Sequence, residues 1–144
     1  MKFAEFSDGQ VIEAGPYLVS EAEVLQFARA YDPQWIHTDA DRAARGRFGG
    51  LIASGWHTCS IAMRLMVDSV LQDSECFASP GVQRIQWTHP VRPGDALRLR
   101  TTVLEARRSR AKPTLGVVRS RWQMRNADDV EVMNAEATSL FDLA

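Results

Sequence analysis

The chain has 144 residues, of which 45% are hydrophobic and 24% charged, with a formal net charge of -1. This length and composition predict one ordinary globular domain spanning residues 1–144, whose core needs neither disulfides nor metals. The balanced charge argues against nucleic acid as the main partner. No apolar stretch reaches the roughly 20 residues of a membrane span. The first six residues lack the apolar core of a secretion signal, so we expect a cytoplasmic protein.

The cysteines and histidines form no recognisable metal-binding pattern. Cys59 and Cys76 stand alone, without a C-x-x-C pairing, and His37, His57 and His89 lie in three separate segments. Zinc sites usually show paired ligands at short spacing. We therefore expect no metal, and we interpret the cysteines as partly buried thiols in a reducing compartment.

A strand and a helix are predicted to open the chain. The strand lies near residues 9–19. Ser20 and Glu23 then form a capping box, in which the hydroxyl and the carboxylate each bond a backbone amide at the start of a helix. Apolar residues recur at helical spacing up to Tyr31. Because Pro33 disfavours helical geometry in the residue before it, we predict that this helix ends at Tyr31.

The longest predicted helix runs from about Ser54, a suitable N-cap, to Gln72. Two elements are predicted before it. A cap-like pattern at residues 38–41 predicts a short helical turn up to Ala44, and the glycines of residues 46–50 predict a turning loop. Apolar residues occupy nearly every side of the long helix. We therefore expect it to lie inside the fold.

The second half of the chain alternates with the two-residue period of half-buried strands. Strands are predicted around residues 85–87, 97–103, 118–125 and 130–141, with turns at 93–95, 107–113 and 126–129. Together with the first strand they predict an α+β fold, in which a curled antiparallel sheet of five or six strands wraps around the long central helix.

A carboxylate and an imidazole, Asp32 and His37, stand five residues apart in the segment YDPQWIHTD. The segment follows a helix end and is expected to be held extended by its proline. Five residues of extended or turning chain can bring both side chains to one point. Such a pair suits hydration chemistry, because a water must lose a proton while the substrate gains one. His titrates near neutral pH, and partial burial can tune an Asp towards it. The alternative is an Asp that caps a turn beside a packed His.

Gly55 stands at the predicted first turn of the central helix, in the segment FGGLIASGWH. An amide N–H there has no acceptor within the helix and lies at the positive end of the helix dipole. It can therefore stabilise an oxyanion. The alternative is a glycine needed only for a tight turn into the helix. Ser54 does not stand in the G-x-S-x-G motif of hydrolase nucleophiles.

The order YDPQWIHTD, FGGLIASGWHT and HPVRPGD, followed by alternating strands, resembles the MaoC-like branch of the hotdog fold, whose best-known members are R-specific enoyl-CoA hydratases. The resemblance covers residues 7–141. It implies a single hotdog domain, a catalytic pair of Asp32 and His37, and an oxyanion-binding amide at Gly55. The family's motif is D-x-N-P-[LI]-H. Gln34 stands where the motif has Asn and is expected to replace its amide at a longer reach, and Trp35 adds bulk at the mouth of the site.

The resemblance also implies the reaction, which is reversible hydration of a 2-enoyl-CoA to a 3-hydroxyacyl-CoA by a carbon–oxygen lyase. CoA is then part of the substrate and no separate cofactor is expected. Members of the family are dimers with the acyl tunnel at the subunit interface, so we expect a homodimer or a larger homo-oligomer. The predicted substrate-binding residues near the pair are Gln34, Trp35, Phe48, Ser54 and Trp56, and the basic residues that could meet the CoA phosphates, or form a solvated hairpin tip, are Arg108, Arg110 and Lys112.

Two other functions stay open, an acyl-CoA thioesterase and a non-catalytic acyl-CoA-binding module of the same fold. Hotdog thioesterases commonly place an acidic residue on the central helix near the thioester. The candidate here is Asp68, which lies about 20 Å along the helix from Gly55 at 1.5 Å per residue and is spaced to pair with Arg64. Hydrolysis is therefore the weaker interpretation.

Overall fold

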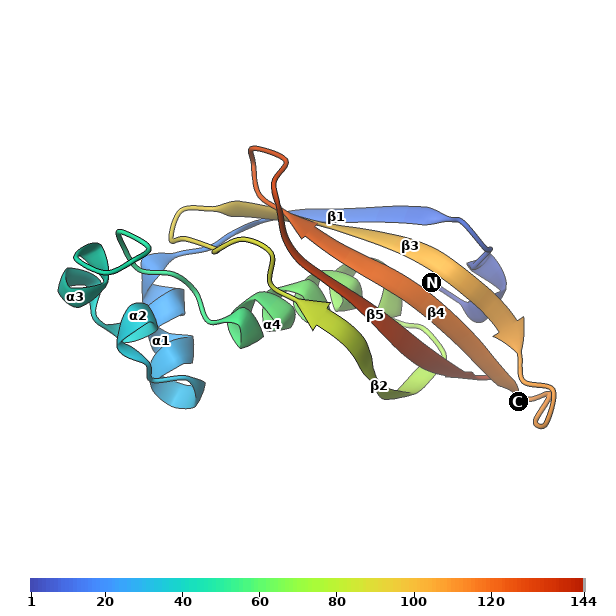
Figure 1. Ribbon diagram of the computed structural model, residues 1–144. Helices are drawn as coiled ribbons and strands as arrows, with labels where there is room; N and C mark the ends of the chain where they lie inside the picture. Colours follow the sequence, from blue (N-terminus) through green and yellow to red (C-terminus); the bar gives the residue numbers. More distant parts are fainter. Residues whose placement is uncertain (144) are drawn as a thin grey trace.

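The computed structural model describes residues 1–143, and its main feature is a five-stranded antiparallel sheet curled around one helix (Figure 1). The helix, α4 (Gly55–Met66), packs against the inner face of the sheet. The predicted α+β architecture is confirmed. The strands are β1 (Val11–Leu18), β2 (Cys76–Gln86), β3 (Ala96–Arg108), β4 (Leu115–Arg125) and β5 (Glu131–Asp142), in the spatial order β1-β3-β4-β5-β2.

The alternating side chains of β3 and β4 face the core as their period predicts. Leu97, Leu99 and Met124 are fully buried, whereas Arg98 and Arg121 on the opposite faces of these strands are exposed. Burial of apolar surface is the main favourable term in folding, and this layer holds the sheet against the helix. The residues that α4 adds to the core are Ile61, Ala62, Leu65 and Met66.

Three helices lie at one end of the sheet, beyond the start of α4 (Figure 1). The first, α1 (Glu21–Tyr31), begins at the predicted capping box, where the Glu23 amide donates to the Ser20 hydroxyl over 3.2 Å. It ends at Tyr31 as predicted. Two short helices follow, α2 (Trp35–Thr38) and α3 (Ala40–Ala44).

Helix α2 corrects the expectation of an extended segment after Pro33. Gln34 is extended, with φ -74° and ψ 143°, and the chain turns directly after it. The Asp39 amide donates to the Trp35 carbonyl oxygen over 3.0 Å. Because these residues have no neighbouring strand, a helical turn satisfies their backbone groups locally.

Strand β2 is longer than its sequence pattern suggested, since it begins at Cys76 and ends one residue before Trp87. Its pairing with β5 shifts register three times, between Cys76 and Ala78, Ala78 and Gly81, and Gln83 and Gln86. Pro80 and Gly81 are typical turn residues, and an edge strand tolerates them because one side of it has no ladder partner. The irregular register hides the two-residue period in the sequence.

The central helix continues past α4 into a last turn of π-helix, η2 (Val67–Leu71), close to the predicted end. The helix lies inside the curled sheet as expected, but the single chain leaves one flank of it uncovered. The side chains of Trp56, Met63 and Val67 are 57%, 42% and 38% exposed, because the sheet ends at β2 and leaves this flank open. No helix within residues 1–143 is long and apolar enough to cross a membrane.

The core at β3 can be tested by truncating one side chain. Leu99 is 1% exposed, so Leu99→Ala should lower the free energy of unfolding by about 2–5 kcal/mol through lost burial and an unfilled cavity. Urea denaturation followed by circular dichroism measures this change. Leu18→Ala, at a residue that is 69% exposed on the edge strand β1, is the control, and an equal loss in both variants would contradict the assignment of Leu99 to the core.

Candidate active site

Asp32 and His37 meet just beyond the end of α1. Asp32 is the C-cap of α1, and His37 lies in α2 and is buried. Nε2 of His37 lies 3.3 Å from Oδ2 of Asp32. The chain between them is turned by two backbone hydrogen bonds, from the Gln34 amide to the Asp32 carbonyl oxygen over 2.8 Å and from the His37 amide to the Gln34 carbonyl oxygen over 2.9 Å. The five-residue spacing thus becomes a direct contact.

The hydrogen bond of Nδ1 shows which ring nitrogen of His37 carries a proton. Nδ1 lies 2.7 Å from the carbonyl oxygen of Ile52. A carbonyl oxygen can only accept a hydrogen bond, so Nδ1 carries a proton and donates it. His37 therefore exchanges protons at Nε2, the nitrogen that faces Asp32.

Two neutral side chains hold the Asp32 carboxylate. Gln34 Nε2 donates to Oδ1 and Ser54 Oγ donates to Oδ2, each over 2.7 Å. The hydrogen bond from Gln34, followed by that from Ser54, lowers the pKa of Asp32 below its ordinary value and outweighs the opposing effect of burial. The expectation that burial tunes Asp32 towards neutral pH is therefore wrong. Asp32 is a carboxylate at neutral pH.

Ser54 also connects Asp32 to the start of α4. Its fully buried hydroxyl accepts the Trp56 amide over 3.3 Å while it donates to Asp32. The Gly55 amide is the first of α4, at the position where a helix supplies no acceptor of its own and where its dipole is positive. Gly55 and His37 line one pocket of about 370 Å³, which we call the catalytic pocket.

Glycine at position 55 is required by space. Gly55 is not among the glycines with positive φ, so the alternative of a conformationally demanding tight turn is not supported. A Cβ built on Gly55 would lie 2.4 Å from Cε2 of Trp87. The indole of Trp87 therefore packs directly on this glycine. Sequence analysis missed the contact, because only the position of the end of β2 brings Trp87 to the start of α4.

The structure separates the predicted substrate-binding aromatic residues. Phe48 lines the catalytic pocket, together with His89. Trp35 is not among the lining residues. The guanidinium of Arg42 lies 4.5 Å from the centre of its ring, which packs against Gly46. Trp56 lines a different, apolar cavity.

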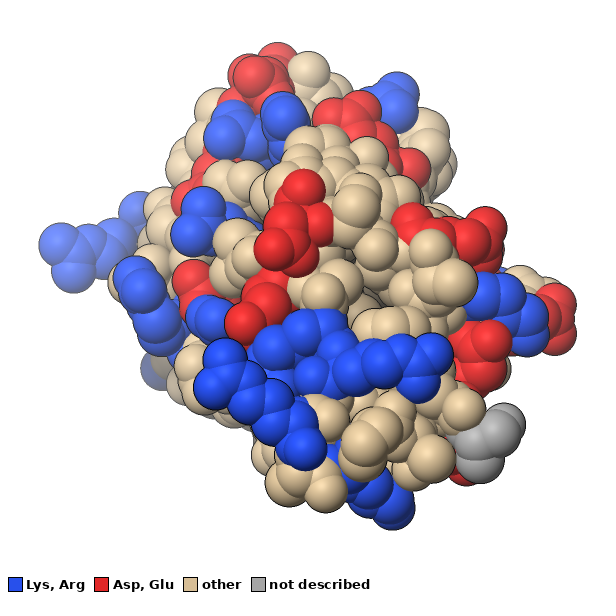
Figure 2. Space-filling view, turned by 90° about the vertical axis from the view of Figure 1, so that its right-hand side faces the viewer, with Lys and Arg blue, Asp and Glu red and all other residues tan. Residues whose placement is uncertain are grey.

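The predicted phosphate-binding residues lie far from this pocket. Arg108 is the last residue of β3, and Arg110 and Lys112 lie in the connection to β4, at the opposite end of the sheet from α1 and the start of α4 (Figure 1). Lys and Arg gather on this end of the molecule, which faces the viewer in Figure 2. Arg108 donates to the Pro113 carbonyl oxygen over 3.0 Å. The structure thus does not bring these residues to the chain's own candidate site, and the hairpin-tip alternative describes them.

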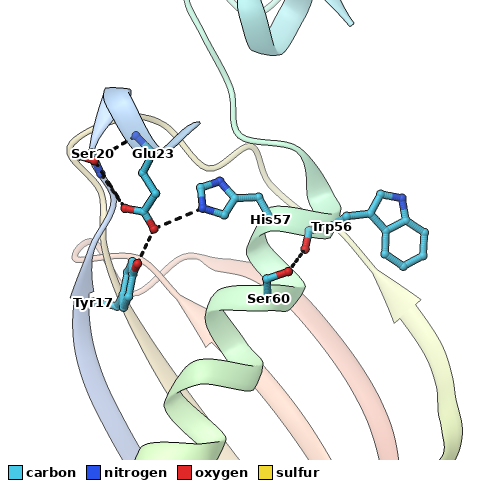
Figure 3. A network of polar contacts seen from close by, with 6 residues as sticks. All are labelled: Tyr17, Ser20, Glu23, Trp56, His57 and Ser60. Atoms are coloured by element: carbon cyan, nitrogen blue, oxygen red, sulfur yellow. Dashed lines mark hydrogen bonds and ion pairs between the residues drawn. The ribbon is translucent and has the colours of Figure 1, made fainter. Parts of the chain in front are cut away.

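A second pair of His and carboxylate, which sequence analysis did not identify, lies beside the first turn of α4 (Figure 3). Nε2 of His57 is 3.3 Å from Oε1 of Glu23, and the imidazole stacks on Phe27 with 4.8 Å between ring centres. Tyr17 donates to the same carboxylate. Burial raises the pKa of Glu23, but the hydrogen bonds from Tyr17 and His57 outweigh it and lower the pKa. These contacts join β1, α1 and α4 next to the catalytic pocket.

The pKa of Asp32 should depend on Gln34. Gln34→Leu removes a hydrogen bond that favours the charged carboxyl, so the pKa of Asp32 should rise. Because the folded pKa is below the unfolded one, the interaction stabilises the fold at neutral pH and is lost as pH falls through the folded pKa. NMR titration of the Asp32 carboxyl carbon measures the shift. Thr38→Val removes only a hydroxyl that bonds the Gln34 carbonyl oxygen, and an equal rise in this control would refute the role of the Gln34 side chain.

Known proteins share both the sequence and the fold of this chain. The family model of the MaoC like domain matches residues 4–123. The solved MaoC-like dehydratase from Rhodospirillum rubrum is 33% identical, with a TM-score of 0.88 over 96% of this chain and 94% of that chain. The 3-hydroxyacyl-thioester dehydratase Z of Mycobacterium tuberculosis is 32% identical over 88 residues, 60% of this chain and 58% of that protein.

A further solved structure identifies the fold. A Mycobacterium tuberculosis protein with a double hotdog fold is 19% identical to this chain, with a TM-score of 0.81 over 99% of this chain and 44% of that one. The curled sheet around α4 is therefore a hotdog fold. With the family model matched over most of its length, the chain belongs to the MaoC-like dehydratase family.

Proposed function

We propose that this protein reversibly hydrates a 2-enoyl-CoA to a 3-hydroxyacyl-CoA. The observation that carries the proposal is the 3.3 Å contact between Asp32 and Nε2 of His37 beside a pocket that the Gly55 backbone also lines. The relative named as a 3-hydroxyacyl-thioester dehydratase supports a thioester as the substrate class. CoA is part of the substrate, and the reaction as proposed requires no other cofactor.

In the hydration direction, a water bonded to Asp32 attacks C3 of the enoyl group. As the water oxygen bonds to C3, Asp32 accepts a proton from the water. Protonated His37 donates its Nε2 proton to C2. The Gly55 N–H donates to the thioester oxygen, on which negative charge develops between the two bond-forming events. The proton then returns from Asp32 to His37 across the 3.3 Å contact. A carboxylate with a low pKa is a weak base, so removal of the water proton accompanies formation of the C3–O bond.

Replacing the carboxylate tests this mechanism. Asp32→Asn cannot accept the proton, so turnover of crotonyl-CoA, followed by loss of the enoyl absorbance, should fall by roughly a hundredfold or more. Asp41→Asn is the matched control, because Asp41 is exposed on α3 and takes no part in the contact between Asp32 and His37. Full turnover in a folded Asp32→Asn variant would rule out Asp32 as the general base.

The same assay separates hydration from the other two functions. Release of free thiol from crotonyl-CoA would indicate a thioesterase, and binding without either product would indicate a non-catalytic module. The acidic residue on which hydrolysis would depend is Asp68. It lies in η2, at the far end of the helix from Gly55, and pairs with Arg64 over 2.8 Å. This arrangement favours hydration over hydrolysis.

We also propose that two copies of this chain associate through β2 and the open flank of α4. As an edge strand, β2 presents backbone groups without ladder partners. Its exposed Phe77 and Val82 continue the apolar surface of Trp56, Met63 and Val67 on the helix. A second copy would cover this contiguous apolar surface.

A charge placed on β2 tests the proposed homodimer. Phe77 is 61% exposed, so Phe77→Lys should convert a dimer into a folded monomer, as measured by light scattering coupled to gel filtration. Leu18→Lys places the same charge on the opposite edge strand, β1, and should leave the dimer intact. A monomeric wild-type chain, or dissociation by Leu18→Lys alone, would contradict the proposed interface.

A further inference from the structure

Two residues of the central helix, one turn apart, bond the two ends of α1. Ser54, the N-cap of α4, donates through Oγ to Asp32, the C-cap of α1, over 2.7 Å. His57, in the first turn of α4, has its Nε2 3.3 Å from Oε1 of Glu23 in the first turn of α1. Positions three apart lie on one face of a helix, whereas Glu23 and Asp32 are separated by roughly 13.5 Å along α1 at 1.5 Å per residue. The two helices are therefore held together at two well-separated points.

Further contacts surround the second point. Oε1 of Glu23 also accepts from the Tyr17 hydroxyl on β1, and Oε2 accepts the Ser20 amide in the capping box (Figure 3). The imidazole of His57 stacks on Phe27 with the ring planes 8° apart. Hydrogen bonds lower the pKa of Glu23 and keep its carboxyl charged. Because a carboxylate only accepts hydrogen bonds, Nε2 of His57 carries a proton and donates it to Glu23.

The other ring nitrogen of His57 makes this residue a costly choice for stability. Nδ1 is buried, and no group within residues 1–143 bonds it. A buried polar atom without a partner destabilises a fold, and an apolar ring of similar size would avoid this cost. Glu23, whose side chain is 27% exposed, would then keep its bonds to Tyr17 and Ser20 and bond water in place of the imidazole. Folding alone therefore does not require the imidazole, which points to another use of its Nε2 donor.

We propose that His57 is a positioning residue, which fixes the rotation of α4 on α1 and thereby the place of the Gly55 amide relative to Asp32. His57 does not line the catalytic pocket and acts through the helix. With the bond from Ser54 alone, α4 could pivot about one point, and the bond to Glu23 supplies the second. A pivot of α4 would move the Gly55 N–H away from the thioester oxygen, and a displacement of about 1 Å can cost a hundredfold in rate. This inference rests on the proposed hydratase function.

The test compares hydration of crotonyl-CoA by the wild type, His57→Phe and His57→Gln. Phenylalanine keeps an aromatic ring on Phe27 but removes the donor, whereas glutamine carries an amide N–H at a similar reach. In His57→Phe, kcat should fall by about tenfold to a hundredfold. KM should stay within about twofold, because the lost stabilisation concerns a charge that develops only after binding. The melting temperature should equal or exceed that of the wild type, and His57→Gln should restore most of the kcat.

NMR titration of the Asp32 carboxyl carbon gives a second readout that does not depend on turnover. The hydrogen bond from Ser54 is one of the two that lower the pKa of Asp32. If α4 pivots and this bond is lost, the pKa of Asp32 should rise in His57→Phe and stay unchanged in His57→Gln.

The outcomes separate the positioning role from the proposed function. A folded His57→Phe variant with the kcat of the wild type and an unchanged pKa of Asp32 overturns the positioning role and leaves the hydratase function standing. Equal losses of kcat and of melting temperature in both variants also overturn it, because they indicate a purely structural residue. A wild type that does not hydrate crotonyl-CoA counts against the hydratase function instead, and the pKa of Asp32 in the two variants then decides whether His57 positions α4.

Discussion

Ser54 connects the two helix ends from which the candidate site is built. Its buried hydroxyl donates to Asp32 just beyond the end of α1 and accepts the Trp56 amide in the first turn of α4. One hydroxyl therefore orients the carboxylate and caps the central helix. It bonds the amide of Trp56 and not that of Gly55, the first residue of the helix. A shift of either helix would break the bond from Ser54 to Asp32, and with it the placement of Asp32 and His37 relative to the Gly55 amide.

Further contacts fix the positions of α1, α4 and His37 around Ser54. His57 and Glu23 tie α4 to α1 and, through Tyr17, to β1. The Ile52 carbonyl oxygen, three residues of chain away from Gly55, orients the imidazole of His37. Hydrogen bonds to Asp32 lower its pKa and keep its carboxyl charged. Asp32 is a carboxylate at neutral pH, and Nδ1 of His37 is bound to the Ile52 carbonyl oxygen, so that Nε2 is the ring nitrogen that faces Asp32.

Some apolar residues of α4 lie on its open flank and are exposed, although their helical pattern suggests burial. Trp56 and Met63 are part of a helix that is apolar on most sides, which is typical of complete burial. In the single chain they are exposed instead, and they line the cavity next to the catalytic pocket. An apolar side chain on such a helix can therefore pack in the core or stay exposed beside a cavity, and helical periodicity alone does not distinguish these positions.

Local patterns in the sequence by themselves determined the strands β3 to β5, the limits of α1, the start of α4 and the spacing that joins Asp32 to His37. Each depends on a short period, a cap or a proline, and these act over a few residues. Only the tertiary structure decided that Trp87 packs on Gly55, that Arg108 lies at the opposite end of the sheet, and that hydrogen bonds lower the pKa of Asp32. The first two outcomes depend on how the fold brings distant segments together. The third depends on the turn at Gln34 and on the contact between Ser54 and Asp32, and no periodic pattern in the sequence records either.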